Sequence, residues 1–158
     1  MRTSALALAF VVAGCAPATY LEPVDVETAT LRIENQGPAI FGYALEADTY
    51  QNAAACSGRL RLAGPEALPR GVAQTVRVAA DAEFTLTLKG SGGGASRSDS
   101  CALAGSFVPG AGERYLAIFR AEERKCELLF VRQQAAPGSA RRYVREASYR
   151  DRYEPACL

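Results

Sequence analysis

Eight short runs of alternating apolar and polar residues constrain the fold of this chain more than any other feature. Every second residue of a run is apolar, as with Leu31 and Ile33 or with Leu86 and Leu88. A period of two places such side chains on one face of a β-strand. No long segment has the 3.6-residue period of an amphipathic helix, so the sequence predicts an all-β fold. The runs span residues 29–35, 40–47, 58–64, 74–80, 83–90, 101–109, 114–122 and 126–133.

Residues that favour turns separate these runs. Clusters of Gly, Pro and Asp occur at 37–38, 64–65, 69–71, 80–82 and 109–112, where the chain must reverse direction. About eight strands at this spacing predict an antiparallel β-sandwich, immunoglobulin-like or transthyretin-like. A small barrel is the alternative, but several connections are long for a simple up-and-down barrel, which favours the sandwich.

The N-terminus has the pattern of an export signal. Arg2 precedes an apolar run from Ser4 to Gly14, which is shorter than the roughly 20 residues of a transmembrane helix. Such a run is typical of a secretory signal peptide. Its end, Val12-Ala13-Gly14-Cys15, resembles the lipobox of bacterial lipoproteins, in which one aliphatic and two small residues precede a cysteine. The resemblance covers residues 1–15 and implies cleavage after Gly14 and acylation of Cys15.

The resemblance, together with the lack of apolar periodicity in residues 16–27, gives the expected domain organisation and location. Residues 1–14 would be the lipoprotein signal peptide, 15–27 the lipidated N-terminus and a tether, and 28–158 the β-sandwich domain. Several acyl chains hold a protein on a membrane stably. The residue after the cysteine is Ala16, which under the sorting rule known for such lipoproteins favours the periplasmic side of the outer membrane. The inner membrane is the alternative.

Four further cysteines predict two disulfides: Cys56, Cys101, Cys126 and Cys157. An even number of cysteines in an exported chain indicates disulfides, and four cysteines allow three connectivities. We expect Cys56–Cys101, which would enclose the Gly/Ser-rich residues 90–100, and Cys126–Cys157, which would hold the C-terminal tail. No two cysteines have the close spacing of a zinc or redox motif, and the chain has no histidine. The sequence therefore predicts no metal and no cofactor.

Charge and residue types argue against several functions. The chain has 18 Lys plus Arg and 17 Asp plus Glu, and loss of Arg2 with the signal peptide leaves 17 of each. Nucleic-acid binding and attraction to anionic lipid both need a basic excess, so neither is predicted. A hydrolase needs an activated nucleophile and a base. With no histidine, the base would have to be a carboxylate or one of the two lysines. Lys89 lies near the serines of 91–100, which makes a Ser/Lys pair conceivable, but nothing marks those serines as activated. We predict that the protein is not an enzyme.

The glycine run of residues 90–94 lacks the sequence context of a phosphate-binding loop and predicts a mobile loop. Two acidic pairs, Glu46 with Asp48 and Glu122 with Glu123, lack the spacing of a calcium loop. We expect both pairs to be solvated.

The C-terminal tail, residues 139–158, is the best candidate for partner binding. Its arginines alternate with tyrosines, and both residue types are enriched in the cores of protein interfaces. Its pattern fits a helix or a strand, and this choice stays open. The tail could instead lie over the sandwich edge as a solvated segment. The candidate residues are Arg142, Tyr143, Arg145, Tyr149 and Arg150.

Fold and location together predict a lipid-anchored binding or scaffold protein of the cell envelope, an accessory or pilot subunit of an envelope assembly, with an envelope protein as its partner. The alternative is an inhibitor of a wall-degrading enzyme. Residues 56–62, CSGRLRL, followed by 89–99, KGSGGGASRSD, are similar in order to lysozyme-inhibitor lipoproteins. Those small disulfide-bearing β-barrels insert a Ser/Gly loop into the enzyme's cleft.

Overall fold

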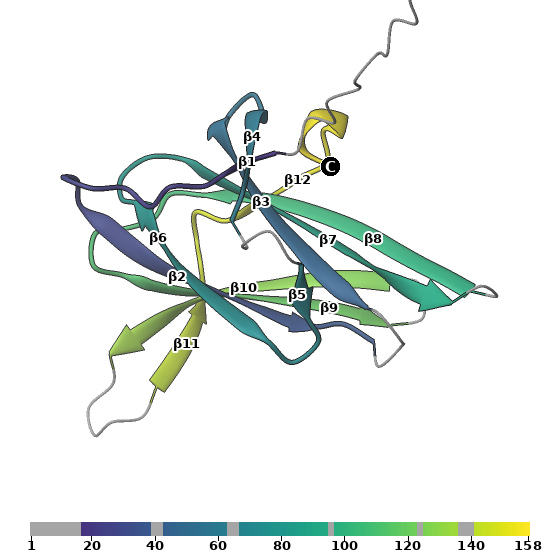
Figure 1. Cartoon of the computed structure of the whole chain (residues 1–158). Coiled ribbons are helices and arrows are strands. Elements are labelled where there is room, and N and C mark those ends of the chain that lie inside the picture. The colour runs from purple at the N-terminus through teal and green to yellow at the C-terminus, as the bar shows by residue number, and fades with distance from the viewer. Residues whose placement is uncertain (1–16, 39–42, 63–66, 95–96, 123–124, 136–140) are drawn as a thin grey trace, which may run out of the picture.

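The computed structural model describes residues 17–38, 43–62, 67–94, 97–122, 125–135 and 141–158. Within them the chain forms strands β1 to β12 and a short 3-10 helix, η1 (Figure 1). Every one of the eight predicted runs contributes a strand. The bounds are β1 (Ala18–Thr19), β2 (Thr28–Gln36), β3 (Ala44–Asn52), β4 (Ser57–Arg61), β5 (Leu68–Pro69), β6 (Ala73–Ala79), β7 (Phe84–Gly94), β8 (Arg97–Phe107), β9 (Arg114–Glu122), β10 (Lys125–Ala135), β11 (Arg141–Arg145), β12 (Arg150–Arg152) and η1 (Pro155–Cys157).

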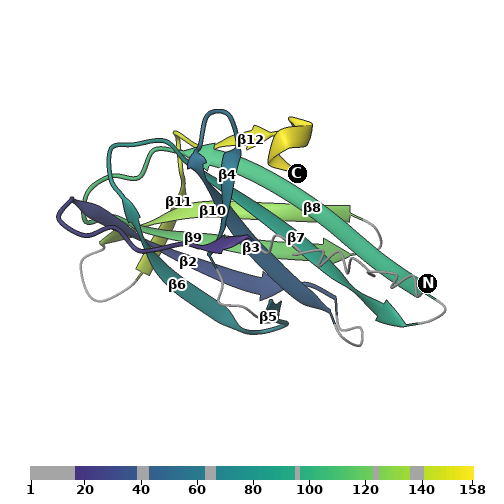
Figure 2. The same ribbon diagram turned by 45° about the horizontal axis from the view of Figure 1, so that its top comes forward.

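The strands form two sheets that pack face to face, which confirms the predicted all-β sandwich (Figure 2). Sheet A has the order β1-β4-β3-β7-β8-β12, with β5 paired to β3, and sheet B has the order β11-β10-β9-β2-β6. The pairs β2/β9 and β1/β4 are parallel, so the sandwich is not antiparallel throughout. The alternation of apolar residues predicts which face of a strand is buried, and it carries no information on strand direction.

The core lies between the inner faces of the two sheets. Leu31 and Ile33 on β2 meet Leu86 and Leu88 on β7 in one apolar cluster, and all four are at most 1% exposed. A chain of ring contacts continues this cluster along the sandwich, through Phe84, Phe107, Tyr115, Phe130 and Tyr149.

The glycine run predicted to be a loop is instead part of a long hairpin. Residues 90–94 extend β7, and they pair with residues 97–101 at the start of β8. Glycine is required here because Phe119 of sheet B and Tyr43, the residue before β3, both approach the strand closely. A Cβ on Gly90 would meet the Phe119 ring at 2.7 Å, and one on Gly92 would meet the backbone nitrogen of Tyr43 at 2.8 Å. The glycines therefore allow close packing where mobility was expected.

The two disulfides join different cysteines from those expected. They are Cys56–Cys157, with Cα atoms 5.1 Å apart, and Cys101–Cys126, with Cα atoms 6.3 Å apart. The expected Cys56–Cys101 bridge is wrong because the two residues lie at different ends of sheet A. Cys56 follows the turn that contacts Thr85, and Thr85 pairs with Ser106. Five residues at 3.4 Å per residue put Cys101 about 17 Å further along β8.

Part of the expected tether lies on the domain. β1 adds to the edge of sheet A beside β4, and Tyr20 donates a hydrogen bond to the carbonyl of Arg77. Glu22 accepts hydrogen bonds from the backbone and side chain of Arg77, and these lower the pKa of the Glu22 carboxyl. The folded part thus begins at or before Ala18, ten residues before the predicted boundary at 28. Cys15 lies outside the described residues.

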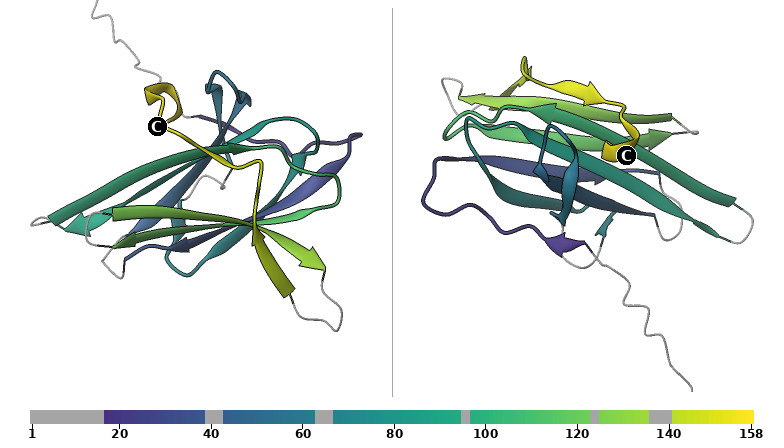
Figure 3. Two further views of the ribbon diagram at one scale, coloured as in Figure 1. Left: turned by 180° about the vertical axis from the view of Figure 1, so that it is seen from behind. Right: turned by 90° about the horizontal axis from the view of Figure 1, so that it is seen from above.

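The β10–β11 hairpin projects from sheet B, away from β1 and η1, which lie on sheet A (Figure 3). The N-terminal strand and the C-terminal helix both lie beside β4, because β1 pairs with β4 and Cys157 is bonded to Cys56. The hairpin and the two ends of the folded part therefore occupy different sides of the sandwich.

Candidate functional site

The outer face of sheet B combines apolar residues with arginines. Two rows of cross-strand neighbours run over it. In one row, Leu116 and Val131 lie between Arg32 on β2 and Arg145 on β11. In the other, Arg114 lies beside Gln133, and Tyr143 comes next. An apolar centre with arginine and tyrosine around it is the composition of a protein-binding surface.

A hollow of about 400 Å³ lies on this face, lined by residues of β2, β6, β9, β10 and β11. Thr30, Thr75 and Tyr143 provide hydroxyl groups to its wall, and Leu116 provides an apolar contact. A second hollow, of about 660 Å³, also includes Arg114 and Gln133 in its lining. Two adjoining hollows suit an extended ligand better than a compact one.

The charge of the first hollow is unbalanced. Arg32 is paired with Glu34 at 2.8 Å. Arg114 and Arg141 also line the hollow, and neither forms an ion pair with any carboxylate of the described residues. Guanidinium groups bind carboxylates through paired hydrogen bonds. The arrangement is therefore suited to an anionic group, with a carboxylate as the best geometric match.

Strand β11 brings together three of the five tail residues selected from the sequence. Tyr143 and Arg145 point to the outer face of sheet B, opposite Gln133 and Val131, while Arg142 lies opposite Gln134 on the other face of β11. All three are exposed. The open choice between helix and strand for the tail is thereby decided for these residues, because pairing with β10 makes them a strand.

Tyr149 and Arg150 lie apart from that group. The Tyr149 ring stacks on Phe130 with centroids 5.0 Å apart and covers Gly105. Burial, followed by a hydrogen bond to Asp151, raises the pKa of Tyr149. Arg150 lies on β12 in sheet A and pairs with Glu83. Tyr149 is thus a packing residue, and Arg150 belongs to a different surface from Tyr143.

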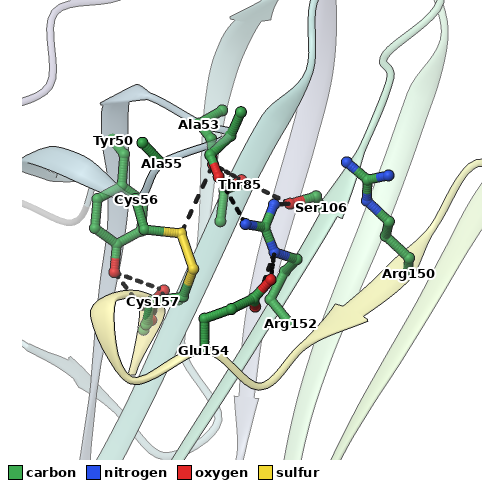
Figure 4. A network of polar contacts seen from close by, with 12 residues as sticks. Tyr50, Ala53, Ala55, Cys56, Thr85, Ser106, Arg150, Arg152, Glu154 and Cys157 are labelled. Carbon is green, nitrogen blue, oxygen red and sulfur yellow. Dashed lines mark hydrogen bonds and ion pairs between the residues drawn. A yellow bond between two sulfur atoms is a disulfide. The ribbon is translucent and has the colours of Figure 1, made fainter.

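The C-terminal segment is fastened to sheet A by a polar network (Figure 4). The buried Arg152 donates to the carbonyl of Ala54 at 2.8 Å, to Ser106 at 3.1 Å and to Glu154 at 3.0 Å. Beside it, Tyr50 and Thr87 both donate to the carbonyl of Cys157. These buried groups find their partners inside the domain, so the network holds the chain end in place.

The remaining candidates for chemistry lie on the outer face of sheet A. Asp48 was expected to be solvated, and this is wrong: it is fully buried, because Arg59 and Arg61 cover it and pair with it. Arg61 also pairs with Glu46. Lys89 lies opposite Glu46. Burial, followed by the charge of Arg59, lowers the pKa of Lys89. Lys89 therefore lies beside an ion-pair cluster.

Tyr143 is the one candidate residue that lines the hollow, and the two arginines that give the hollow its charge, Arg114 and Arg141, were not among the candidates. Arg114 could have been found from the alternation in residues 114–122, which places it on the same strand face as Leu116. The signal for Arg141 was its spacing from Tyr143 and Arg145 in a strand.

No protein-family model matches this chain, and no curated protein is significantly similar to it. No helix of the described residues is long and apolar enough to span a membrane. The same residues contain no group of three or more potential metal ligands.

Proposed function

We propose that this protein is a lipid-anchored binding or scaffold protein of the cell envelope, acting as an accessory or pilot subunit of an envelope assembly. The single observation that supports recognition is the hollow on the outer face of sheet B, where Arg114 and Arg141 lie beside Leu116 and Tyr143. The lipobox-like residues ending at Cys15 support the anchor. The partner would be an envelope protein.

The hollow supports binding without chemistry. Arginine and tyrosine provide most of the affinity in many interfaces when they lie around an apolar centre. The described lining of the hollow has one carboxylate, Glu34, which is already paired with Arg32. If a partner binds this face of sheet B, sheet A can remain on the side of the membrane.

A photo-crosslinker at position 143 tests the binding surface. Tyr143 is 44% exposed in the hollow, and Tyr153, 77% exposed on the sheet A side, is the matched control. We expect Tyr143→p-benzoylphenylalanine to give discrete adducts with an envelope protein in source cells, while the same change at Tyr153 gives none. Equal adducts from both positions, or none from Tyr143, would contradict the proposed surface.

The anchor has a separate test. We expect Cys15→Ala to abolish acylation and to release the protein from the membrane fraction, because the thiol that accepts the lipid is lost. Normal processing and full membrane retention of that variant would overturn the lipoprotein assignment.

The inhibitor alternative gains no particular support. Its resemblance depends on a Ser/Gly loop, and most of that segment pairs as β7 and β8. A lysis assay with a c-type lysozyme gives a direct check, since an inhibitor would slow lysis at near-stoichiometric amounts.

A further inference from the structure

Strand β11 is an open edge of sheet B. It lies at the end of the strand order, and among the described strands it pairs only with β10. Within the described residues, its backbone forms no hydrogen bond to any segment other than β10. An edge strand with free N–H and C=O groups is able to accept another strand.

The other sheet edges are shorter or covered. β1 has two residues and β12 has three. At the opposite edge of sheet B, β6 is longer, but the N-terminal segment lies against it: Tyr20 donates to the carbonyl of Arg77, and the Arg77 amide donates to Glu22. β11 is therefore the edge best placed to accept a strand of several residues.

The positive charge of β11 determines which kind of partner strand it can bind. Three of its five residues are arginines, and none of the three forms an ion pair with a carboxylate of the described residues. The nearest acid along the chain, Glu146, is buried, lies 3.5 Å from Arg132 and accepts two hydrogen bonds from Ser148. Opposite charges on paired strands stabilise the pairing, and like charges destabilise it.

The same charges make a second copy of this chain a poor occupant. Antiparallel self-pairing centred on Tyr143 would place Arg141 against Arg145 twice. Charged residues on edge strands commonly prevent such association. On β11 they prevent self-association and at the same time favour an acidic strand.

We propose that β11 accepts an extended acidic segment of a partner protein as an added strand of sheet B, an inference that rests on the proposed function. Arg141 and Arg145 share a strand face with Tyr143 between them. The partner strand therefore carries two carboxylates four residues apart with an apolar residue midway, so that the carboxylates meet the arginines and the apolar residue packs on the tyrosine ring.

Synthetic peptides test this inference on the full chain in neutral detergent. The probe is acetyl-ETVTETVTE-amide, which has the required spacing. One control replaces each glutamate by lysine, and another replaces each threonine by proline, which keeps every carboxylate and removes the backbone donors needed for strand pairing. We expect the probe to bind at least tenfold tighter than either control, measured by calorimetry, and to slow amide exchange in residues 141–145. Equal affinity for the probe and either control, or unchanged exchange, would overturn the inference.

Charge reversal provides a second readout. The double variant R141E/R145E should lose at least tenfold in affinity for the acidic probe and should prefer the lysine peptide. The matched control is R120E/R150E, which alters net charge equally at two exposed arginines outside β11 and should keep the original preference. The same loss in both variants would overturn the inference, because the effect would then come from net charge.

These results are separable from the test of the proposed function. Adducts at position 143 without a preference for the acidic probe would refute strand addition and support the binding surface. A preference for the probe without adducts in cells would support strand addition and contradict the proposed function.

Discussion

Tyr149 restricts which residue can occupy position 105. The tyrosine ring lies over the glycine, and a Cβ added to Gly105 would approach the ring Cζ at 2.5 Å. The stacking of Tyr149 on Phe130 also extends the aromatic chain of the core. The sequence does not distinguish Tyr149 from Tyr143, since each lies next to an arginine in the tail. The two tyrosines differ only in the structure: β12 pairs with β8 and brings Tyr149 against the core, whereas Tyr143 stays exposed.

We expect Tyr149→Ala to lower the free energy of unfolding by about 2 kcal/mol. This is less than the 3–5 kcal/mol typical of fully buried aromatic residues, because the ring is partly exposed. Gly105→Ala should cost about 1–3 kcal/mol through overpacking. Urea unfolding of the single and double variants measures both effects. The double variant should be more stable than the sum predicts, since the clash disappears with the ring. Strict additivity would contradict this packing.

At the scale of elements, the C-terminal segment contains two arginines, Arg150 and Arg152, that are alike in sequence and differ in their surroundings. Arg152 has a side chain 10% exposed and donates to several groups of sheet A, whereas the side chain of Arg150 is 64% exposed and pairs with Glu83. Removing a buried charged donor leaves its acceptors unsatisfied. An exposed ion pair contributes little.

We expect Arg152→Ala to lower the free energy of unfolding by about 2–3 kcal/mol and to increase amide exchange in residues 150–157. The matched change Arg150→Ala should alter it by no more than about 1 kcal/mol. Denaturant unfolding with hydrogen exchange checks both. Equal effects of the two variants would show that the network in Figure 4 does not hold the segment.

The strands of the core were predictable and the strands of the tail were not. Leu31, Ile33, Leu86 and Leu88 alternate with polar residues because one strand face is buried, and that alternation is visible in the sequence. In β11 four of five residues are exposed, so no such pattern exists, and pairing with β10 determines its conformation. The alternation in residues 114–122 could place Arg114 on a strand face. That Arg114 shares a hollow with Arg141 could not be predicted, because this depends on the order of the strands in sheet B.

At the scale of the whole molecule, the two disulfides close loops of different length. Cys56 and Cys157 are 101 residues apart in sequence, and Cys101 and Cys126 are 25 apart. In the chain-entropy model these loops correspond to about 4.7 and about 3.5 kcal/mol of stabilisation. The longer bridge joins the C-terminus to sheet A, and the shorter one joins β8 in sheet A to β10 in sheet B.

We expect non-reducing peptide mapping to find the Cys56–Cys157 and Cys101–Cys126 pairs. The double variant Cys56→Ser/Cys157→Ser should lose more stability in urea than Cys101→Ser/Cys126→Ser, because it opens the longer loop. Any other connectivity in the map would refute the pairing. A larger loss on opening the shorter bridge would refute the ranking.

The attachment of β1 to sheet A limits how far the protein could reach. Ala18, the first residue of β1, is three positions after Cys15, and an extended chain covers at most about 3.5 Å per residue. If Cys15 is acylated as proposed, Ala18 at the edge of sheet A would lie within roughly 10 Å of the acylated residue. The β10–β11 hairpin would then face outward from the bilayer, and a partner strand would have to arrive at that height. The protein would therefore bind partners close to its own membrane and would not reach across the space beyond it.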